Sequence, residues 1–417
     1  MAETSTSQTA APQTAAPQPA AAASDSASAV PQAQSAEISS ATATAPKTAP
    51  LSGKTEIFFD AEAVLQEAAA ILSQEKEEAE PDQEYTELYT VIPEAKRYSV
   101  GLGGMNHTLT KKFRNQFLRE HGQKQLTAIL YDSLPYRNYI RAQLKAKKMP
   151  LILQYLPIIE SNYKINAVSR TGATGLWQFM ANSMHPYLKK NTWYDERLDP
   201  WKETEAALKK LQENYKMFGS WELALAAYNM GAGAMTRVLK KHPGKDFWYL
   251  AEHGYLPAQT RDYVPKLIAA ADVIENAEYY GVLEIGAADK ALDTHPVENY
   301  EYVTVAGMIS LDQIAKLTGI KRSELDFLNP SLLKKCTPAG EKYSLRVPAG
   351  TSKEAEKALE KADIATDALI YVVQKGDSLW GISRRYKLTV EDLCKVNNIN
   401  EKSILRINQK LVIPVFK

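Results

Sequence analysis

The chain has 417 residues, enough for more than one folded unit and for a sizeable core. Its 50 Lys and Arg residues balance 49 Asp and Glu residues, and the net charge of +1 supplies no field for gripping a polyanion, so nucleic acid is not an expected partner. No apolar run approaches the roughly 18 residues that span a bilayer. Two cysteines exclude a disulfide scaffold, and six scattered histidines show no metal-binding spacing, so neither a metal nor another cofactor is expected.

Residues 1–54 consist mostly of Ala, Pro, Ser, Thr and Gln, which cannot bury enough apolar surface to offset the entropy of ordering. This composition predicts a disordered tether. The segment Met1 to Gln18 has neither the basic nor the apolar region of a secretory leader, so no leader is expected in it. From residue 55 apolar residues recur at helical intervals, and residues 55–134 are predicted to form a helical N-terminal extension.

Residues 135–282 carry the densest helical pattern and are predicted to form the main domain. Asp199 followed by Pro200 predicts the start of a helix, which Gly219 ends. Ser220 is expected to cap the next helix, whose apolar residues on every side predict burial. A last helix is predicted over residues 261–280, with a kink at Pro265.

Residues 300–349 and 370–415 look like distant copies of each other, and each predicts strand, helix, helix, strand. Residues 350–369 between them are rich in Ala, Lys and Glu and predict a charged helical linker. Cys336 and Cys394 lie one in each copy, and free buried thiols are expected. The overall fold class is therefore mainly α, with small α+β modules and a disordered N-terminal tether.

Glu160 ends an apolar run in which seven of the nine preceding residues are apolar. Burial beside such residues would raise the pKa of Glu160 toward the value of about 6 that suits a general acid at neutral pH. The alternative is a helix-terminal carboxylate that faces water.

Two further stretches could form a site with Glu160. Residues 169–175 form a polar, Gly-containing turn, and Leu176 to Met180 are predicted to open another helix; small residues at such a turn allow a polymer to approach closely. Tyr228 and Asn229 end the predicted buried helix and need polar partners if they are buried. The alternatives are an ordinary loop with Trp177 in the core, and a simple helix end.

Taken together, these residues resemble the lytic transglycosylases with a soluble-type catalytic domain, most closely the membrane-bound lytic murein transglycosylase D group. Five motifs in one order carry the resemblance: Glu160-Ser161, Gly175-Leu176-Trp177-Gln178-Phe179-Met180, Asp195-Glu196-Arg197-Leu198-Asp199-Pro200, Ala226-Ala227-Tyr228-Asn229 and Thr260-Arg261-Asp262-Tyr263-Val264. The sequence departs from the family at Ala181, where Pro is usual, and at Gln259, where Glu is usual.

The resemblance implies a goose-type lysozyme-like helical fold and a single catalytic acid and base at Glu160. It also implies that the glycan strand and the catalytic carboxyl are held by Ser161, Ser169, Gln178, Met180, Tyr228, Asn229 and Tyr263. Hydrolases of glycans usually need two carboxylates, yet no Asp or Glu occurs between Ser161 and Tyr194. A second carboxylate from a remote segment stays open.

A single carboxylate fits an intramolecular reaction at the β-1,4 bond between N-acetylmuramic acid and N-acetylglucosamine. Glu160 first protonates the glycosidic oxygen and then deprotonates the C6 hydroxyl, which attacks C1 and closes a 1,6-anhydro ring. The alternatives are a hydrolysing muramidase of the goose-lysozyme type and a non-catalytic peptidoglycan-binding or scaffolding protein.

The C-terminal copy, residues 370–415, resembles a LysM module, in which Gly376, Asp377, Ser378 and Leu379 would contribute to the glycan-binding groove. Simple helix capping by Ser378 is compatible with that role. The copy at 300–349 lacks the Gly-Asp-Ser turn and is expected to be a degenerate spacer. The expected partner is peptidoglycan, which implies location in the periplasm or cell envelope, and no transmembrane helix is expected.

Overall fold

The computed structural model describes residues 91–92, 94–296, 299–362 and 364–415. The predicted tether, residues 1–54, and the extension as far as residue 90 lie outside these residues. Among the described helices, none is both long and apolar enough to cross a membrane.

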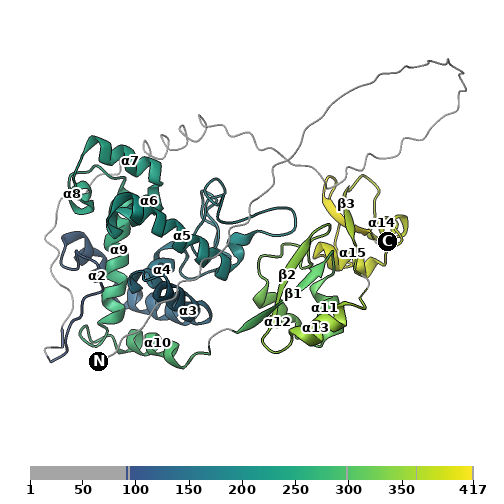
Figure 1. The fold of residues 1–417 in the computed structure, drawn as a ribbon, viewed down its shortest axis with the longest axis horizontal. Coiled ribbons are helices and arrows are strands. Elements are labelled where there is room, and N and C mark those ends of the chain that lie inside the picture. The colour runs from purple at the N-terminus through teal and green to yellow at the C-terminus, as the bar shows by residue number, and fades with distance from the viewer. Residues whose placement is uncertain (1–90, 93, 297–298, 363, 416–417) are drawn as a thin grey trace, which may run out of the picture. The chain divides into compact units, whose positions relative to one another are not determined.

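The first part of the described chain is helical, and α9 lies at its centre (Figure 1). α9 packs against α2, α4 and α6, and its middle is buried from Tyr263 to Ile274 with the exception of Lys266. The elements are α2 (Thr108–Leu118), α3 (Glu120–Ala146), η1 (Leu151–Tyr155), α4 (Leu156–Ser161), η2 (Glu196–Leu198), α5 (Pro200–Phe218), α6 (Trp221–Met230), α7 (Ala232–Lys241), α8 (Phe247–Glu252), α9 (Ala258–Glu275) and α10 (Leu283–Thr294).

The helix α3 crosses the boundary expected between residues 134 and 135 without a break. Leu126 and Leu130 before that point and Ile140 and Leu144 after it belong to one apolar core. The described end of the predicted extension is therefore part of the helical domain rather than a separate unit.

The capping and helix-ending residues in the sequence correctly predicted where α5 and α6 begin and where α5 ends. The Asp199 carboxylate accepts a hydrogen bond from the Lys202 amide at 3.0 Å, Pro200 opens α5, and Gly219 ends it at φ +71°. Ser220 caps α6, and its residues from Leu223 to Tyr228 are all buried, as expected of a helix that is apolar on every side. The helix predicted over 261–280 begins at Ala258 and ends at Glu275.

The prediction of a helix opening at Leu176 is wrong. Gly175 and Gln178 have φ values of +97° and +52°, which a right-handed helix excludes, and Thr174 pairs with both Val168 and Phe179 in short antiparallel bridges. The segment is a tight turn inside a small β-ribbon. The apolar residues that suggested a helix are buried because the ribbon packs on the core.

Two modules follow, and both have the predicted order of strand, helix, helix, strand. Each holds one antiparallel pair of strands, with Tyr300 opposite Pro348 in the first and Asp367 opposite Val415 in the second. Their elements are β1 (Tyr300–Ala306), α11 (Leu311–Thr318), α12 (Arg322–Leu328) and β2 (Lys342–Pro348), then β3 (Asp367–Val372), α14 (Leu379–Arg385), α15 (Val390–Asn397) and β4 (Lys410–Val415).

The charged segment between the modules is helical but is not a linker. α13 (Ser352–Leu359) packs on β1 and α11, and its Ala355 and Leu359 are buried in the first module's core. Ala365 then pairs with Met308. Charged residues cover only the outer face of α13, which is why its composition suggested a spacer.

Cys336 and Cys394 are both buried and free, as expected.

Candidate active site

Glu160 lies near the end of the short helix α4, with its side chain half-buried. Its carboxylate accepts a hydrogen bond from the Tyr263 hydroxyl of α9. Burial raises the pKa of Glu160 to about 7, while the Tyr263 hydrogen bond and the positive charge of Lys210 oppose the rise. The alternative of a fully solvated helix-terminal carboxylate is therefore wrong, and the group can hold or release a proton near neutral pH.

Three of the predicted site residues hold the turn of residues 175–179. The Ser161 hydroxyl donates to the Leu176 carbonyl at 2.8 Å, and the Tyr228 hydroxyl donates to the Trp177 carbonyl at 2.9 Å. The Gln178 side-chain amide donates to the Gly175 carbonyl at 2.8 Å. Because Ser161 follows Glu160 directly in the chain, the turn and the Glu160 carboxyl are fixed to each other.

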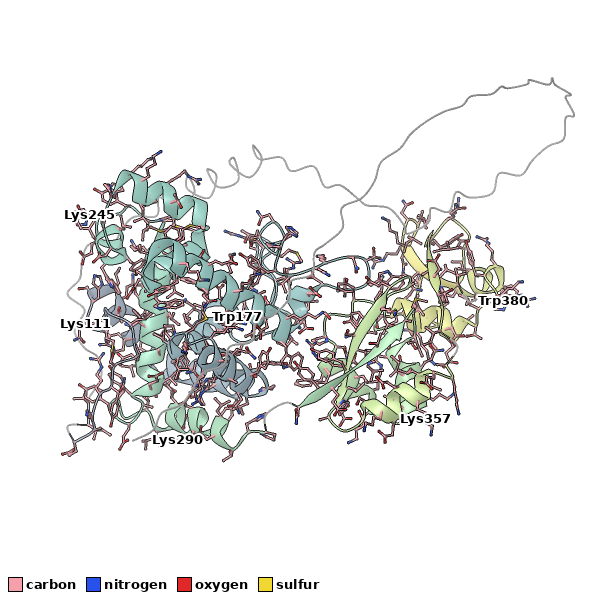
Figure 2. The ribbon with its side chains drawn as sticks, in the orientation of Figure 1. Lys111, Trp177, Lys245, Lys290, Lys357 and Trp380 are labelled. Carbon is pink, nitrogen blue, oxygen red and sulfur yellow. The ribbon has the colours of Figure 1, made fainter. Side chains whose placement is uncertain are left out.

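The turn of residues 175–179 contains a buried tryptophan side chain. Trp177, labelled in Figure 2, has no exposed surface and donates its ring N–H to the Thr204 hydroxyl at 3.0 Å. The interpretation of Trp177 as a core residue is therefore confirmed.

The remaining predicted residues occupy the edges of this region. The Ser169 hydroxyl accepts from the Ala173 amide at 3.0 Å and so shapes the loop before the turn. Met180 is half-buried just after the turn. Asn229, at the end of α6, accepts from the Thr260 hydroxyl of α9 at 2.8 Å. Within the described residues, none of these three has a hydrogen bond to Glu160, so their roles stay predictions.

Sequence reasoning missed Lys210, which α5 brings to the same region. Its ammonium nitrogen lies 5.2 Å from the Phe179 ring centre and 4.9 Å from that of Tyr228, and it donates to the Ser183 hydroxyl at 3.4 Å. Burial lowers the pKa of Lys210, and the negative charge of Glu160 acts in the opposite direction.

Sequence reasoning also missed Glu203, which has no exposed surface and lies behind the turn. A Cβ added to Gly175 would come within 2.6 Å of both of its carboxylate oxygens. Burial raises the pKa of Glu203 well above its usual range, although the backbone amides of Trp177, Leu176 and Phe179 lower it in part. The neutral form of Glu203 is thus favoured.

A signal for both residues was present in the sequence. Glu203, Ala207 and Lys210 are spaced by four and three residues, so a helix places them on one face. Ala207 has no exposed surface and lies on the buried face of α5. A charged residue one turn before it and another one turn after it are the departures from an apolar face that mark a functional site.

In the second module, the four predicted residues form the turn that leads into α14. Gly376 has φ +90°, Ser378 caps α14 by accepting from the Gly381 amide at 3.1 Å, and Leu379 is buried. The Asp377 carboxylate accepts from the Tyr371 hydroxyl at 2.6 Å and the Gln374 amide at 2.7 Å. The capping role of Ser378 is confirmed, and glycan binding by this turn stays a prediction.

In the part of the chain that the structure describes, no group of three or more His, Cys, Asp or Glu side chains is placed to hold a metal ion.

Comparison with known proteins agrees with this architecture. Residues 137–251 match the family model of the transglycosylase SLT domain, and residues 371–414 match that of the LysM domain. Residues 299–364 match the LysM-like domain of the lytic transglycosylase MltD. That last match includes α13, in agreement with its packing in the first module.

Two curated proteins are similar over different lengths. The membrane-bound lytic murein transglycosylase D of Escherichia coli (strain K12) is 31% identical over 323 residues, which cover 72% of this chain and 69% of that protein. A putative tributyltin chloride resistance protein of Alteromonas sp. (strain M-1) is 35% identical over 114 residues, covering 27% of this chain and 55% of that one. Among solved structures, the 70 kDa soluble lytic transglycosylase from Escherichia coli is 18% identical with a TM-score of 0.28, over 43% of this chain and 35% of that one.

The helical domain with its two small α+β modules therefore defines the chain as a lytic transglycosylase enzyme with an SLT catalytic domain. More narrowly, the chain belongs to the membrane-bound lytic murein transglycosylase D family. The family indicated by the five motifs is confirmed, and so is the mainly α class with small α+β modules over the described residues.

Proposed function

We propose that the enzyme cleaves the β-1,4 bond between N-acetylmuramic acid and N-acetylglucosamine in peptidoglycan without hydrolysis, with Glu160 acting first as acid and then as base. The observation that carries the proposal is the environment of Glu160: a half-buried carboxyl whose pKa is raised to about 7 and which a single tyrosine hydroxyl orients. A group with these properties is protonated often enough to donate and ionised often enough to accept.

The reaction needs only groups that the substrate and Glu160 supply. Protonation of the glycosidic oxygen releases the N-acetylglucosamine side of the strand, and C1 of the muramoyl unit develops positive charge. The C6 hydroxyl of the same unit attacks C1 and gives its proton to the Glu160 carboxylate, so the 1,6-anhydro ring forms and the acid is regenerated. Because the hydroxyl is tethered to the reacting sugar, no water has to be positioned.

The nearest alternative is a hydrolysing muramidase, which would use a second ionised carboxylate to activate water. The sequence left open a second carboxylate from a remote segment, and Glu203 is one such carboxyl in this region. Its complete burial and raised pKa make it unsuited to that role, because it reaches no water and favours its neutral form. The other alternative is a peptidoglycan-binding protein without catalytic activity. The raised pKa of the Glu160 carboxyl argues against it.

The second module is proposed to hold the enzyme on the same polymer, through the turn of residues 376–379. A weak glycan-binding module on the same chain raises the local concentration of the catalytic domain at the strand. Cleavage of peptidoglycan places the enzyme in the periplasm or cell envelope.

The test is Glu160→Gln, which keeps the shape of the side chain and removes the proton. We expect turnover of purified sacculi to fall by a factor of at least about 10³ while sedimentation with sacculi is retained. The mass of the fragments released by the wild-type enzyme distinguishes the reactions, since a hydrolytic product is heavier by one water. Reducing ends among the fragments, or substantial activity in the variant, would refute the proposal.

A pH dependence follows from the same carboxyl. We expect the rate to fall as the pH rises above about 7, because Glu160 then loses the proton that it must donate first. Since the folded-state pKa lies above the ordinary value of 4.5, the stabilising contribution of protonated Glu160 is complete below pH 4.5 and is lost as the pH rises through about 7.

That linkage can be measured without substrate. Glu160→Gln should have the stability of the wild type at pH 4 and exceed it by up to ~3 kcal/mol at pH 8, as read from urea unfolding curves. Equal stabilities at pH 8 would mean that the carboxyl is not perturbed in the folded enzyme.

A further inference from the structure

Lys210 is a partly buried cation beside the catalytic carboxyl, and it lies on α5 with its side chain directed over the aromatic pair Phe179 and Tyr228. These two rings meet edge to face, with their centres 6.2 Å apart. Tyr228 in turn holds the turn of residues 175–179, so the ammonium group is fixed to the same framework as Glu160.

The ammonium group forms no direct ion pair with a described carboxylate, and the nearby Glu160 acts on it through its charge alone. None of the ion pairs found among the described residues includes Lys210, and its one hydrogen bond goes to the Ser183 hydroxyl. An ammonium group carries three donors, so two remain for a ligand. Taking an ammonium group partly out of water without a carboxylate partner is costly, and the two ring faces offset only part of that cost.

The neighbouring lysine shows that this burial belongs to one position. Lys209 is exposed, and its nitrogen lies 5.6 Å from the Tyr187 ring centre. Both lysines occupy the middle of the same helix, yet only Lys210 lies at Phe179 and Tyr228. The position of Lys209 is therefore that of an ordinary lysine on a solvent-exposed helix face, whereas the partial burial of Lys210 needs another explanation.

We propose that Lys210 forms a subsite for a carboxylate on the sugar held at the active site, and that this carboxylate is the free lactyl group of a muramoyl unit without a stem peptide. This rests on the proposed function, which brings a muramoyl unit to Glu160. The lactyl ether on C3 of that sugar ends in a carboxyl group, which is anionic when free and a neutral amide when a peptide is attached. The ammonium group complements the first form and not the second.

The proposal predicts a specificity for peptide-free glycan. A hydrogen bond between charged groups inside a partly desolvated site changes affinity by about tenfold relative to its neutral counterpart. Lys210 would thus make the enzyme prefer strands from which peptides have been removed, with the effect on KM rather than on kcat, because the carboxylate is bound equally before and during the reaction.

The experiment uses two matched substrates and three forms of the full chain. The substrates are short peptide-free oligosaccharides of alternating N-acetylglucosamine and N-acetylmuramic acid, with the lactyl group either as free carboxylate or converted to the carboxamide. The enzymes are the wild type, Lys210→Met and the control Lys209→Met. The measurement is kcat and KM at pH 6, from the mass-detected 1,6-anhydro product.

We expect the wild type and Lys209→Met to have kcat/KM values about tenfold higher on the carboxylate than on the carboxamide. Lys210→Met should lose that preference through a raised KM on the carboxylate, while any change in kcat, which follows from loss of the Lys210 charge beside Glu160, should be the same on both substrates. Lys210→Gln serves as a second variant, and the thermal midpoints show whether each variant is folded.

Two outcomes would overturn the proposal: no preference in the wild type, or a preference that survives in Lys210→Met. The second would mean that Lys210 acts only on the charge of Glu160. Failure of the proposed function looks different, because the wild type would then release no 1,6-anhydro product from either substrate.

Discussion

The two βααβ modules are built around the same internal hydrogen bonds. Asn329 in the first and Asn397 in the second each end the second helix of their module. Asn329 accepts from the Arg346 amide at 2.9 Å and donates to the Arg346 carbonyl at 2.8 Å. Asn397 accepts from the Val412 amide at 2.7 Å and donates to the Val412 carbonyl at 2.8 Å. Arg346 and Val412 therefore occupy matching places in the last strands.

The modules differ in what those matching residues contact. Arg346 is 3% exposed, and its guanidinium donates at 2.5 Å to the carboxylate of Asp199, the residue that caps α5. It also lies 4.8 Å from the ring centre of Trp201. Val412 is equally buried, but it belongs to the apolar core of the first module.

The loops after the second helices differ as well. In the first module this loop forms backbone hydrogen bonds with the catalytic domain, from the Asp195 amide to the Ser331 carbonyl at 3.0 Å and from the Leu333 amide to the Trp193 carbonyl at 2.8 Å. In the second module, the matching loop exposes Ile404 to 90% and Ile407 to 60%.

One fold thus serves two purposes in the same chain. The first module completes the catalytic domain: it buries the cap of the helix that carries Glu203 and Lys210. In that module the loop after the second helix is covered by the catalytic domain. The matching loop of the second module is exposed, and Trp380, which lies on α14 of the same module, is 63% exposed (Figure 2).

The largest expected effect comes from Arg346. Replacing it with Met leaves the Asp199 carboxylate, which has no exposed surface, without its cation, and breaking a buried pair in this way costs about 3–5 kcal/mol. We expect Arg346→Met to lower the free energy of unfolding, read from urea curves, by that amount and to reduce turnover, since the start of α5 loosens.

The matched control is the double variant with Asp199→Asn. Asn still caps a helix, and no buried charge remains, so most of the stability should return. A single variant within about 1 kcal/mol of the wild type would mean that the first module is a spacer after all.

The shared asparagines give the next effect. Alanine at either position leaves a buried amide and a buried carbonyl of the last strand without partners, at a cost of about 1–3 kcal/mol. Asn329→Ala should destabilise the catalytic domain together with its module and lower turnover. Asn397→Ala should weaken only the second module and leave turnover of a soluble substrate unchanged.

Hydrogen exchange followed by mass spectrometry separates the two cases. Faster exchange should extend from residues 300–348 into α5 for Asn329→Ala and stay within residues 367–415 for Asn397→Ala. Identical patterns in the two variants would contradict the distinction between the modules.

The sequence predicted local features far better than contacts between distant segments. Asp199, Pro200, Gly219 and Ser220 fix helix ends through their own backbone and nearby amides, so α5 and α6 were placed correctly. The repeated βααβ pattern was likewise visible, because each copy carries its own apolar periodicity.

What failed depends on partners remote in the chain. The turn at 175–179 holds its left-handed residues because Ser161 and Tyr228 fix its carbonyls. Asp199 and Arg346 are separated by 147 residues in the sequence, and no local sequence pattern predicts that they pair. Glu160 was predicted because an isolated carboxyl in an apolar run is a local signal, whereas the cation beside it comes from a different helix.

The smallest effect concerns the two loops. Replacing Ile404 and Ile407 with Ser removes apolar surface that is already exposed, so stability should stay within about 0.5 kcal/mol of the wild type. If this loop contributes to glycan binding, retention on insoluble peptidoglycan should fall about threefold to tenfold, the loss expected for one or two apolar contacts. Leu333→Ser in the first module, at a residue that is 39% exposed, should leave retention unchanged.

Co-sedimentation with sacculi measures the retention of both variants, each carrying Glu160→Gln so that the substrate is not cleaved. A loss of retention in Leu333→Ser equal to that in the double variant would show that both modules bind the polymer, and would remove the division of labour between them.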